Sequence, residues 1–242
     1  MKKLLLWIAV AIMLAACGNR KTSVVISGDI HDGNNQKIRL ALVTADGMEM
    51  IDSTNLRNGR FEFKIPSENA LIKEREDSPM MFHLFLSDNN SIATMARKGE
   101  RLEITADARN LAGTYRISGG EEAVLMRQLE SALAVFVSAA DSLYAIYEEN
   151  ITSDTVRADI EAAYMKHVQA HRHYLEGFIA GHPNNMASYI AFYQSYGRRS
   201  FFDVYQDLDL LKQINTNMAR IYPENEYVKT MIHVAEMVES RR

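Results

Sequence analysis

The sequence predicts an α+β protein, with an N-terminal antiparallel β-sandwich-like domain followed by an all-helical domain that contains a long helical hairpin. From about residue 24 to residue 117, apolar side chains recur at every second position, which is typical of strands with one buried face. After Ser118 the period changes to that of an amphipathic helix. We therefore assign residues 24–118 to the β-sandwich-like domain and residues 119–242 to the helical domain.

The first residues have the layout of a secretory signal. Lys2 and Lys3 provide a positive start, residues 4–16 are apolar throughout, and small residues precede Cys17. An apolar helix of this length rises only about 20 Å, which is short of the roughly 30 Å hydrocarbon core of a membrane. We therefore predict a signal peptide at residues 1–16 and a linker at residues 17–23.

The segment Leu14-Ala15-Ala16-Cys17 resembles the lipobox of bacterial lipoproteins. In that family the cysteine sulfur receives a diacylglycerol and the new terminal amine is acylated, for example with palmitate. Two or more acyl chains give stable anchoring. The resemblance implies lipidation at Cys17, and the alternative is an ordinary signal peptide that is cut elsewhere. Basic residues follow the cysteine where some lipoproteins carry an acidic export signal, which favours the periplasmic face of the outer membrane.

Composition limits the classes of partner. Without residues 1–16 the chain has 25 basic and 31 acidic residues, which are interspersed, so it shows no basic surface for nucleic acid. Cys17 is the only cysteine. A disulfide within the chain is therefore excluded, and stability must come from packing.

The β region contains about eight strand-like runs, enough for a small sandwich. Residues 38–43, 61–65 and 102–106 alternate clearly between apolar and polar positions. Asn58-Gly59 predicts a two-residue type I′ turn, because both residue types tolerate positive φ. Residues 80–86 are apolar on both faces, which predicts a central strand covered on its second side by another layer.

Two long apolar stripes predict the helical hairpin. The first runs from Leu125 to Tyr147, and Glu121 and Glu122 precede it, where negative charge suits the helix dipole. The second stripe comprises Ile160, Tyr164, Val168, His171, Leu175 and Phe178. The break at about residues 150–153 is short, so we expect the two helices to be antiparallel. Shorter helices are expected at about residues 185–196, 200–214 and 224–239.

Several phrases together resemble a β domain of unknown function. They are VISGDI at 25–30, IRL at 38–40, DST at 52–54 and NGRFEF at 58–63. That domain begins lipoprotein thiol-disulfide oxidoreductases, in which a helical segment follows with a phrase similar to FIAGHPNN at 178–185. A thioredoxin-like domain with a C-x-x-C pair then comes last. The resemblance covers about residues 24–240. It does not include the thioredoxin-like domain, which this sequence lacks.

The missing C-x-x-C pair decides what the resemblance implies here. Disulfide exchange requires a thiolate that attacks a sulfur, so the redox activity does not carry over. We expect a non-catalytic, membrane-anchored binding or scaffold module without a cofactor, accessory to a separate thiol-disulfide enzyme and bound to an envelope protein partner. The alternatives are an envelope small-ligand receptor, or an enzyme with an unrecognised site between the two domains.

The region after residue 188 is rich in tyrosine and arginine. Tyrosines and arginines at a surface favour recognition, whereas the spacing of Tyr189, Tyr193 and Tyr196 is also that of a buried helical stripe. Both interpretations stay open from the sequence. The candidate binding residues are Tyr189, Tyr193, Tyr196, Arg198 and Arg199.

Histidines and methionines are the candidate metal ligands. His167 and His171 are four residues apart and share a helix face, but no third ligand is apparent and His171 lies on the apolar stripe. We interpret these histidines as structural. A group of methionines could select a soft metal, but methionine is also a common core residue, and we interpret the group in that way. Its members are Met48, Met50, Met80 and Met81.

Overall fold

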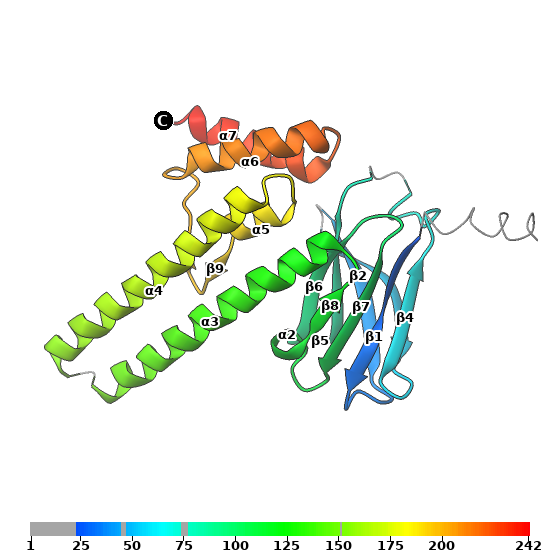
Figure 1. Cartoon of the computed structure of the whole chain (residues 1–242), viewed down its shortest axis with the longest axis horizontal. Coiled ribbons are helices and arrows are strands. Elements are labelled where there is room, and N and C mark those ends of the chain that lie inside the picture. The colour runs from blue at the N-terminus through cyan, green and yellow to red at the C-terminus, as the bar shows by residue number, and fades with distance from the viewer. Residues whose placement is uncertain (1–22, 45–46, 74–76, 151) are drawn as a thin grey trace, which may run out of the picture. The chain divides into compact units, whose positions relative to one another are not determined.

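The computed structural model describes residues 23–44, 47–73, 77–150 and 152–242 (Figure 1). The predicted signal peptide, Cys17 and most of the linker lie outside the described residues. The chain divides into two compact units, one up to Gly120 and one from Glu121 onward. Unit 1 contains β sheets and unit 2 contains long helices, so the predicted α+β class is confirmed.

Unit 1 is built from two four-stranded sheets. The strand order of sheet A is β4-β1-β7-β8, and that of sheet B is β3-β2-β5-β6. The strands of sheet A are β1 (Val24–His31), β4 (Arg60–Ile65), β7 (Arg101–Asp107) and β8 (Arg116–Ser118). The strands of sheet B are β2 (Lys37–Thr44), β3 (Gly47–Asn55), β5 (Met80–Ser87) and β6 (Asn90–Ala96). A short helix, α2 (Leu111–Thr114), joins β7 to β8.

The strand pairs of the two sheets are antiparallel, as predicted, except for one pair. Strands β1 and β7 pair in parallel, from Val25 opposite Arg101 to His31 opposite Asp107. A parallel pair requires a long connection, and here the whole of sheet B lies between the two strands in sequence. Alternation within each strand does not report the direction of its neighbour, so the sequence pattern cannot distinguish the two pairings.

The predicted alternation places the core correctly. In β4 the side chains of Phe61, Phe63 and Ile65 are buried, and the residues between them are exposed. Strand β5 lies between β2 and β6, as predicted for a central strand. Its second face, however, is only half-covered at Met81 and His83.

The predicted hairpin turn is also confirmed. Asn58 and Gly59 both have positive φ, at 52° and 80°, and the backbones of Arg57 and Arg60 exchange two hydrogen bonds of 3.1 Å. This turn connects β3 of sheet B to β4 of sheet A.

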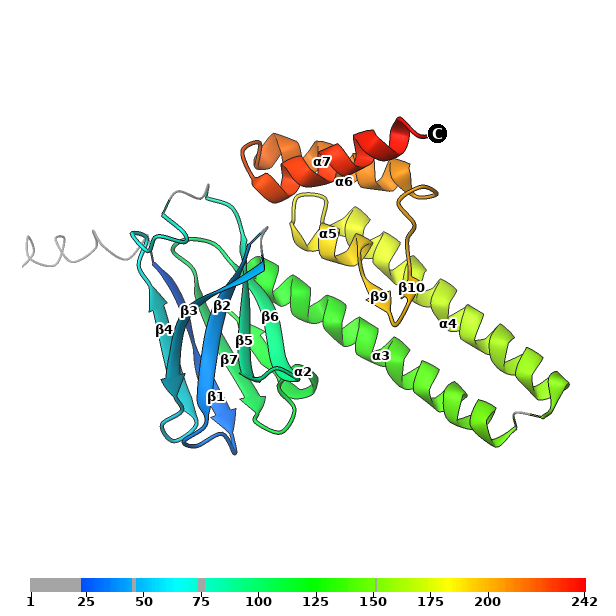
Figure 2. The ribbon, with the colours of Figure 1, turned by 180° about the vertical axis from the view of Figure 1, so that it is seen from behind.

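Unit 2 contains a long helical hairpin and three shorter helices (Figure 2). The helices are α3 (Glu121–Glu149), α4 (Asp154–Gly181), α5 (Ala187–Phe192), α6 (Leu208–Ile221) and α7 (Glu226–Glu239). The side chain of Ser153 accepts a hydrogen bond from the Val156 amide and caps the start of α4. The prediction of two long helices joined by a short break is therefore confirmed.

The prediction for residues 185–214 is partly wrong. Helix α5 ends at Phe192, and two short strands follow, β9 (Ser195–Tyr196) and β10 (Arg199–Ser200), so unit 2 is not all-helical. Gly197 turns between these strands with a positive φ of 58°. The next helix begins only at Leu208, because the side chains of Asp203 and Asp207 bind nearby backbone amides and stabilise a turn instead.

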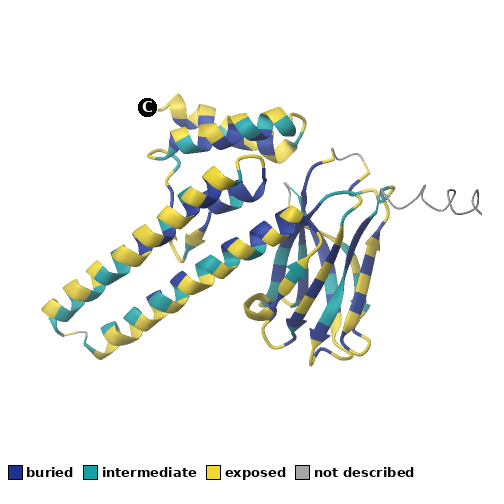
Figure 3. Cartoon of the chain, in the orientation of Figure 1, coloured by how far each residue is buried: buried dark blue, intermediate teal, exposed yellow. Residues whose placement is uncertain are grey.

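Burial along the helical hairpin is uneven (Figure 3). The last buried residue of α3 is Ala140, and the first buried residue of α4 is Val168. Between them, at residues 141–150 and 152–167, no described residue is buried. We call this segment the hairpin tip.

Candidate functional site

The short β9–β10 hairpin lies against both long helices of unit 2. The hydroxyl of Tyr196 donates to Asp141 on α3 at 3.0 Å, and the guanidinium of Arg199 lies 5.5 Å from the ring centre of Tyr164 on α4. Phe201 follows β10, and its ring packs edge-on against Phe136 of α3 at 5.1 Å. The β9–β10 hairpin therefore contacts both α3 and α4 at the base of the hairpin tip, where Asp141 and Tyr164 lie.

The structure separates the predicted tyrosine and arginine group. Tyr189 is fully buried and its hydroxyl donates to Asn215 at 2.8 Å, so it belongs to the core and does not line an open groove. Burial raises the pKa of the Tyr189 hydroxyl above its usual value. Tyr193 lies past the end of α5, beside Phe192. The two predicted arginines are exposed on the β9–β10 hairpin, together with half-buried Tyr196. The members are therefore not one helical stripe, because α5 ends before Tyr193.

His171 is a buried, hydrogen-bonded histidine, as its structural interpretation predicts. Its Nε2 lies 2.7 Å from Oε1 of Gln194, and we assign the ring nitrogen as the donor because an amide oxygen accepts. Burial lowers the pKa of His171. His167, in contrast, is exposed. Among the described residues, no group of three or more His, Cys, Asp or Glu side chains is arranged to hold a metal ion.

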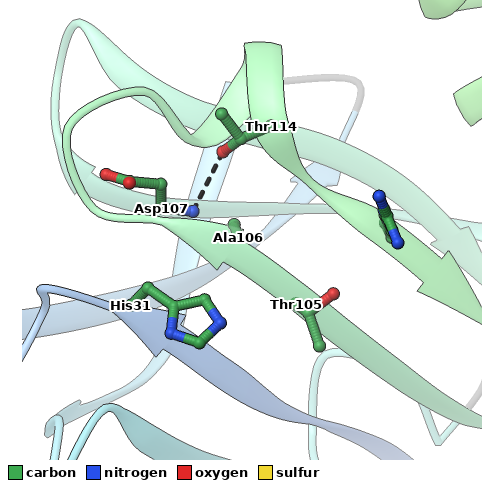
Figure 4. A pocket seen from close by; sticks show the side chains of 6 residues that line it. His31, Thr105, Ala106, Asp107 and Thr114 are labelled. Atoms are coloured by element: carbon green, nitrogen blue, oxygen red, sulfur yellow. Dashed lines mark hydrogen bonds between the residues drawn. The ribbon is translucent and has the colours of Figure 1, made fainter.

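An open cavity of about 330 Å³ lies in unit 1 at the ends of β1 and β7 (Figure 4). It is lined by His31, Thr105, Ala106, Asp107, Thr114 and Arg116. Arg109 donates to the Asp107 carboxylate from its backbone and its side chain, at 2.9 Å in each case, and holds the pKa of that carboxyl well below its usual range. A carboxylate that is already paired and ionised is poorly suited to general acid–base catalysis near neutral pH. The sequence did not predict this cavity, because His31 on β1 meets the β7–β8 segment that supplies the other lining residues only through the parallel pairing of β1 with β7.

Aromatic and apolar side chains lie exposed at the hairpin tip. Tyr144 is 61% exposed and Ile146 is 45% exposed. The ring of Tyr144 stacks on that of Tyr147 at 6.4 Å, and a hydrogen bond to Glu148 raises the pKa of Tyr144. Residues 141–167 contain six acidic residues, one arginine and one lysine, so the tip is also acidic.

By length and composition alone, α3 could cross a membrane, and it is the one such helix among the described residues. Within unit 2, however, it packs through Leu129, Phe136 and Ala140, and aromatic contacts join it to α4. Only 17% of its most apolar 18-residue stretch is buried. Much of the apolar surface of α3 therefore remains exposed, although the helix packs in unit 2.

The fold and these sites define a two-unit α+β protein whose first unit is a β-sandwich-like module. Residues 24–126 match the family described as a domain of unknown function, DUF4369. The match covers both sheets of unit 1 and the first turns of α3. No curated protein and no solved structure matches the chain.

Proposed function

We propose that this protein is a membrane-anchored lipoprotein of the cell envelope that acts as a non-catalytic binding module. Its partner is another envelope protein, and the resemblance of residues 24–240 to the accessory half of thiol-disulfide oxidoreductases favours a separate thioredoxin-like enzyme. The observation that carries the proposal is the hairpin tip, where neither α3 nor α4 has a buried residue.

The composition of the tip is typical of two helices that pack against a third helix. Two helices alone bury only the seam between them, whereas bundles bury further faces against additional helices. Leu143, Tyr147, Val156 and Ile160 are all only partly covered, beside exposed Tyr144. Contiguous apolar surface with aromatic residues is a common mark of a protein-binding site. A partner helix that packs across both helices of the tip would bury these side chains.

The charge of the tip indicates the kind of partner surface. Acidic residues occur in the tip on both helices, and Arg157 and Lys166 are the basic residues among them. A partner with an apolar centre and a basic border would be attracted and oriented by this field. Because exposed charges are screened by salt, the association rate should fall as ionic strength rises.

The buried and half-buried ionisable groups at the centre of unit 2 favour binding rather than catalysis. Arg172 forms a two-pronged ion pair with Asp207, at 2.6 and 3.0 Å, which raises the pKa of the arginine and lowers that of the aspartate. His171 is held by Gln194. Groups fixed by such partners stabilise the fold and are not available to a substrate.

Lipidation at Cys17 has a direct test. Cells that express the full chain and are fed labelled palmitate should yield a labelled, membrane-bound protein, whereas Cys17→Ala should be unlabelled and released from membranes by washing. The reason is that a thioether at this sulfur is the first step of the attachment. If the wild-type chain were unlabelled and soluble, the anchored part of the proposal would be rejected.

The hairpin tip can be tested by photo-crosslinking in intact cells. A benzophenone amino acid at position 146 should crosslink to an envelope protein that contains a C-x-x-C pair, identified by mass spectrometry. The same amino acid at position 233, which is exposed on α7, is the matched control and should give no such product. Tyr144→Ser should weaken the crosslink of the position-146 variant. Equal products at both positions, or products without a thiol-disulfide enzyme, would contradict the proposed partner.

A further inference from the structure

One face of sheet B carries a group of sulfur and imidazole side chains. Leu40 and Leu42 of β2 and Phe82 and Leu84 of β5 point into the core, where their exposure is 1% or less. Because side chains alternate along a strand, the residues between them point to the opposite face. Ala41, His83 and Met81 therefore lie on the outer face of sheet B.

The pairing of β3 adds two methionines to this face. Met50 lies opposite Ala41 and Met48 lies opposite Val43, while His83 lies opposite Ala41 from the other side. Met48 is 60% exposed and Met50 is 52% exposed, so the interpretation of these two methionines as core residues is wrong. It is confirmed for Met80, which is 4% exposed. The alternation placed Met48 and Met50 together correctly but did not show which face was covered.

One short contact in this group joins two potential metal ligands. Nδ1 of His83 lies 3.1 Å from Sδ of Met48. Metal bonds of about 2.0 Å to imidazole nitrogen and about 2.3 Å to sulfur hold two donors of one ion roughly 3 to 4 Å apart. Met50, Ala41 and His83 form one row across β3, β2 and β5, and the short side chain of Ala41 stands between the other two.

The donor types select a soft ion. Thioether sulfur prefers Cu(I) over the harder divalent ions, and imidazole also binds copper. In the part of the chain that the structure describes, no three or more His, Cys, Asp or Glu side chains are arranged to hold a metal ion, so the thioethers are the additional donors beside His83.

We propose that Met48, Met50 and His83 form a surface site for Cu(I), with two thioether sulfurs and one imidazole nitrogen as ligands. The site is open to solvent through Met48 and Met50, which suits reversible loading. Met81 lies two residues from His83 on the same face and borders the site. The proposal is independent of the hairpin tip and of the lipid anchor.

The test uses residues 17–242 with Cys17→Ala in every sample, so that no thiol competes for the metal. Cu(I) is titrated without oxygen against the chromogenic chelator bicinchoninate, and Ag(I) serves as a redox-stable probe. We expect one equivalent to bind. Met48→Leu and His83→Gln should each weaken binding by about tenfold or more, which is at least roughly 1.4 kcal/mol.

The matched control is Met237→Leu on α7, because Met237 is also exposed, at 41%, but has no role in the proposed site. It should leave the affinity unchanged. In ¹³C-methyl spectra, Ag(I) should shift the methyl signals of Met48 and Met50 and leave that of Met237 in place. This spectrum also tests whether Met48 and Met50 bind the metal if His83→Gln does not fold.

Three results would overturn the site: no stoichiometric binding, an affinity that Met48→Leu does not change, or equal shifts at Met237 and Met48. Equal shifts would show that silver binds any exposed thioether. A circular dichroism spectrum and melting curve like those of the parent chain should accompany each variant, so that lost binding is not mistaken for lost structure.

Discussion

Replacing Glu122 by alanine is expected to destabilise unit 2 by about 3 kcal/mol or more. Glu122 lies in the first turn of α3 but is only 1% exposed. Its carboxylate accepts hydrogen bonds from the backbone amides of Met186 and Ala187, at 2.9 and 3.0 Å, and from the side chain of Asn185 at 3.3 Å. Helix α5 starts at Ala187 without a side-chain cap of its own, so Glu122 supplies that cap from another helix.

The cost arises because alanine leaves buried amide donors without this acceptor. Each unsatisfied buried donor costs about 1–3 kcal/mol, and a negative charge at the start of a helix is favourable in addition. Glu122→Gln keeps the shape and one acceptor oxygen, so its effect should be intermediate. Thermal and urea unfolding followed by circular dichroism would measure the loss, which should lower the melting temperature by roughly 10 °C or more.

Glu121→Ala is the matched control for Glu122→Ala. Glu121 is exposed in the same turn of α3, so it contributes only through the helix dipole, by about 0.3–1 kcal/mol. Equal losses at the two positions would show that the amide contacts of Glu122 contribute nothing beyond the helix dipole. Hydrogen exchange should show faster opening of α5 in Glu122→Ala and unchanged exchange in Glu121→Ala.

This pair of glutamates illustrates what the sequence can predict. Both stand at the start of a periodic stripe, and the dipole argument applies equally to both. Their difference depends on amides at residues 186 and 187, which are more than 60 residues away in the chain. Period and turn residues are local, so they predicted the long helices and the Asn58-Gly59 turn. Contacts at long range leave no local pattern.

For the candidate sites, too, local patterns were predictable from the sequence and long-range contacts were not. The spacing of Tyr189 and Tyr193 suggests one helix face, but α5 is too short to carry both. Alternation placed Met48 and Met50 on one face, whereas His83 reaches them only through the pairing of β2 with β5. The hairpin tip was visible as two apolar stripes in the sequence. Its lack of burial was not, because an apolar stripe does not report whether anything covers it.

Gly28→Ala is expected to destabilise unit 1 by about 3 kcal/mol or more, through backbone crowding rather than lost contacts. Gly28 lies in β1 between Phe61 of β4 and Ile104 of β7. A Cβ atom at this position would lie 2.0 Å from the carbonyl oxygen of Ile104 and 3.0 Å from the ring of Phe61. The oxygen belongs to the backbone of a paired strand, so it cannot move aside as a flexible side chain would.

The expected damage is therefore to the parallel β1–β7 pairing, the feature of unit 1 that alternation could not predict. Hydrogen exchange should increase first in β1 and β7, and the melting temperature should fall by roughly 10 °C or more. Ser27→Ala is the matched control in the same strand, because it removes only a long 3.4 Å contact to the Leu102 carbonyl and should cost less than about 1 kcal/mol. If Gly28→Ala proved as stable as Ser27→Ala, the close approach of β1 to β7 would be wrong. A loss specific to Gly28 would give the glycine of the VISGDI phrase a physical role: it allows two parallel strands to approach where any side chain would separate them.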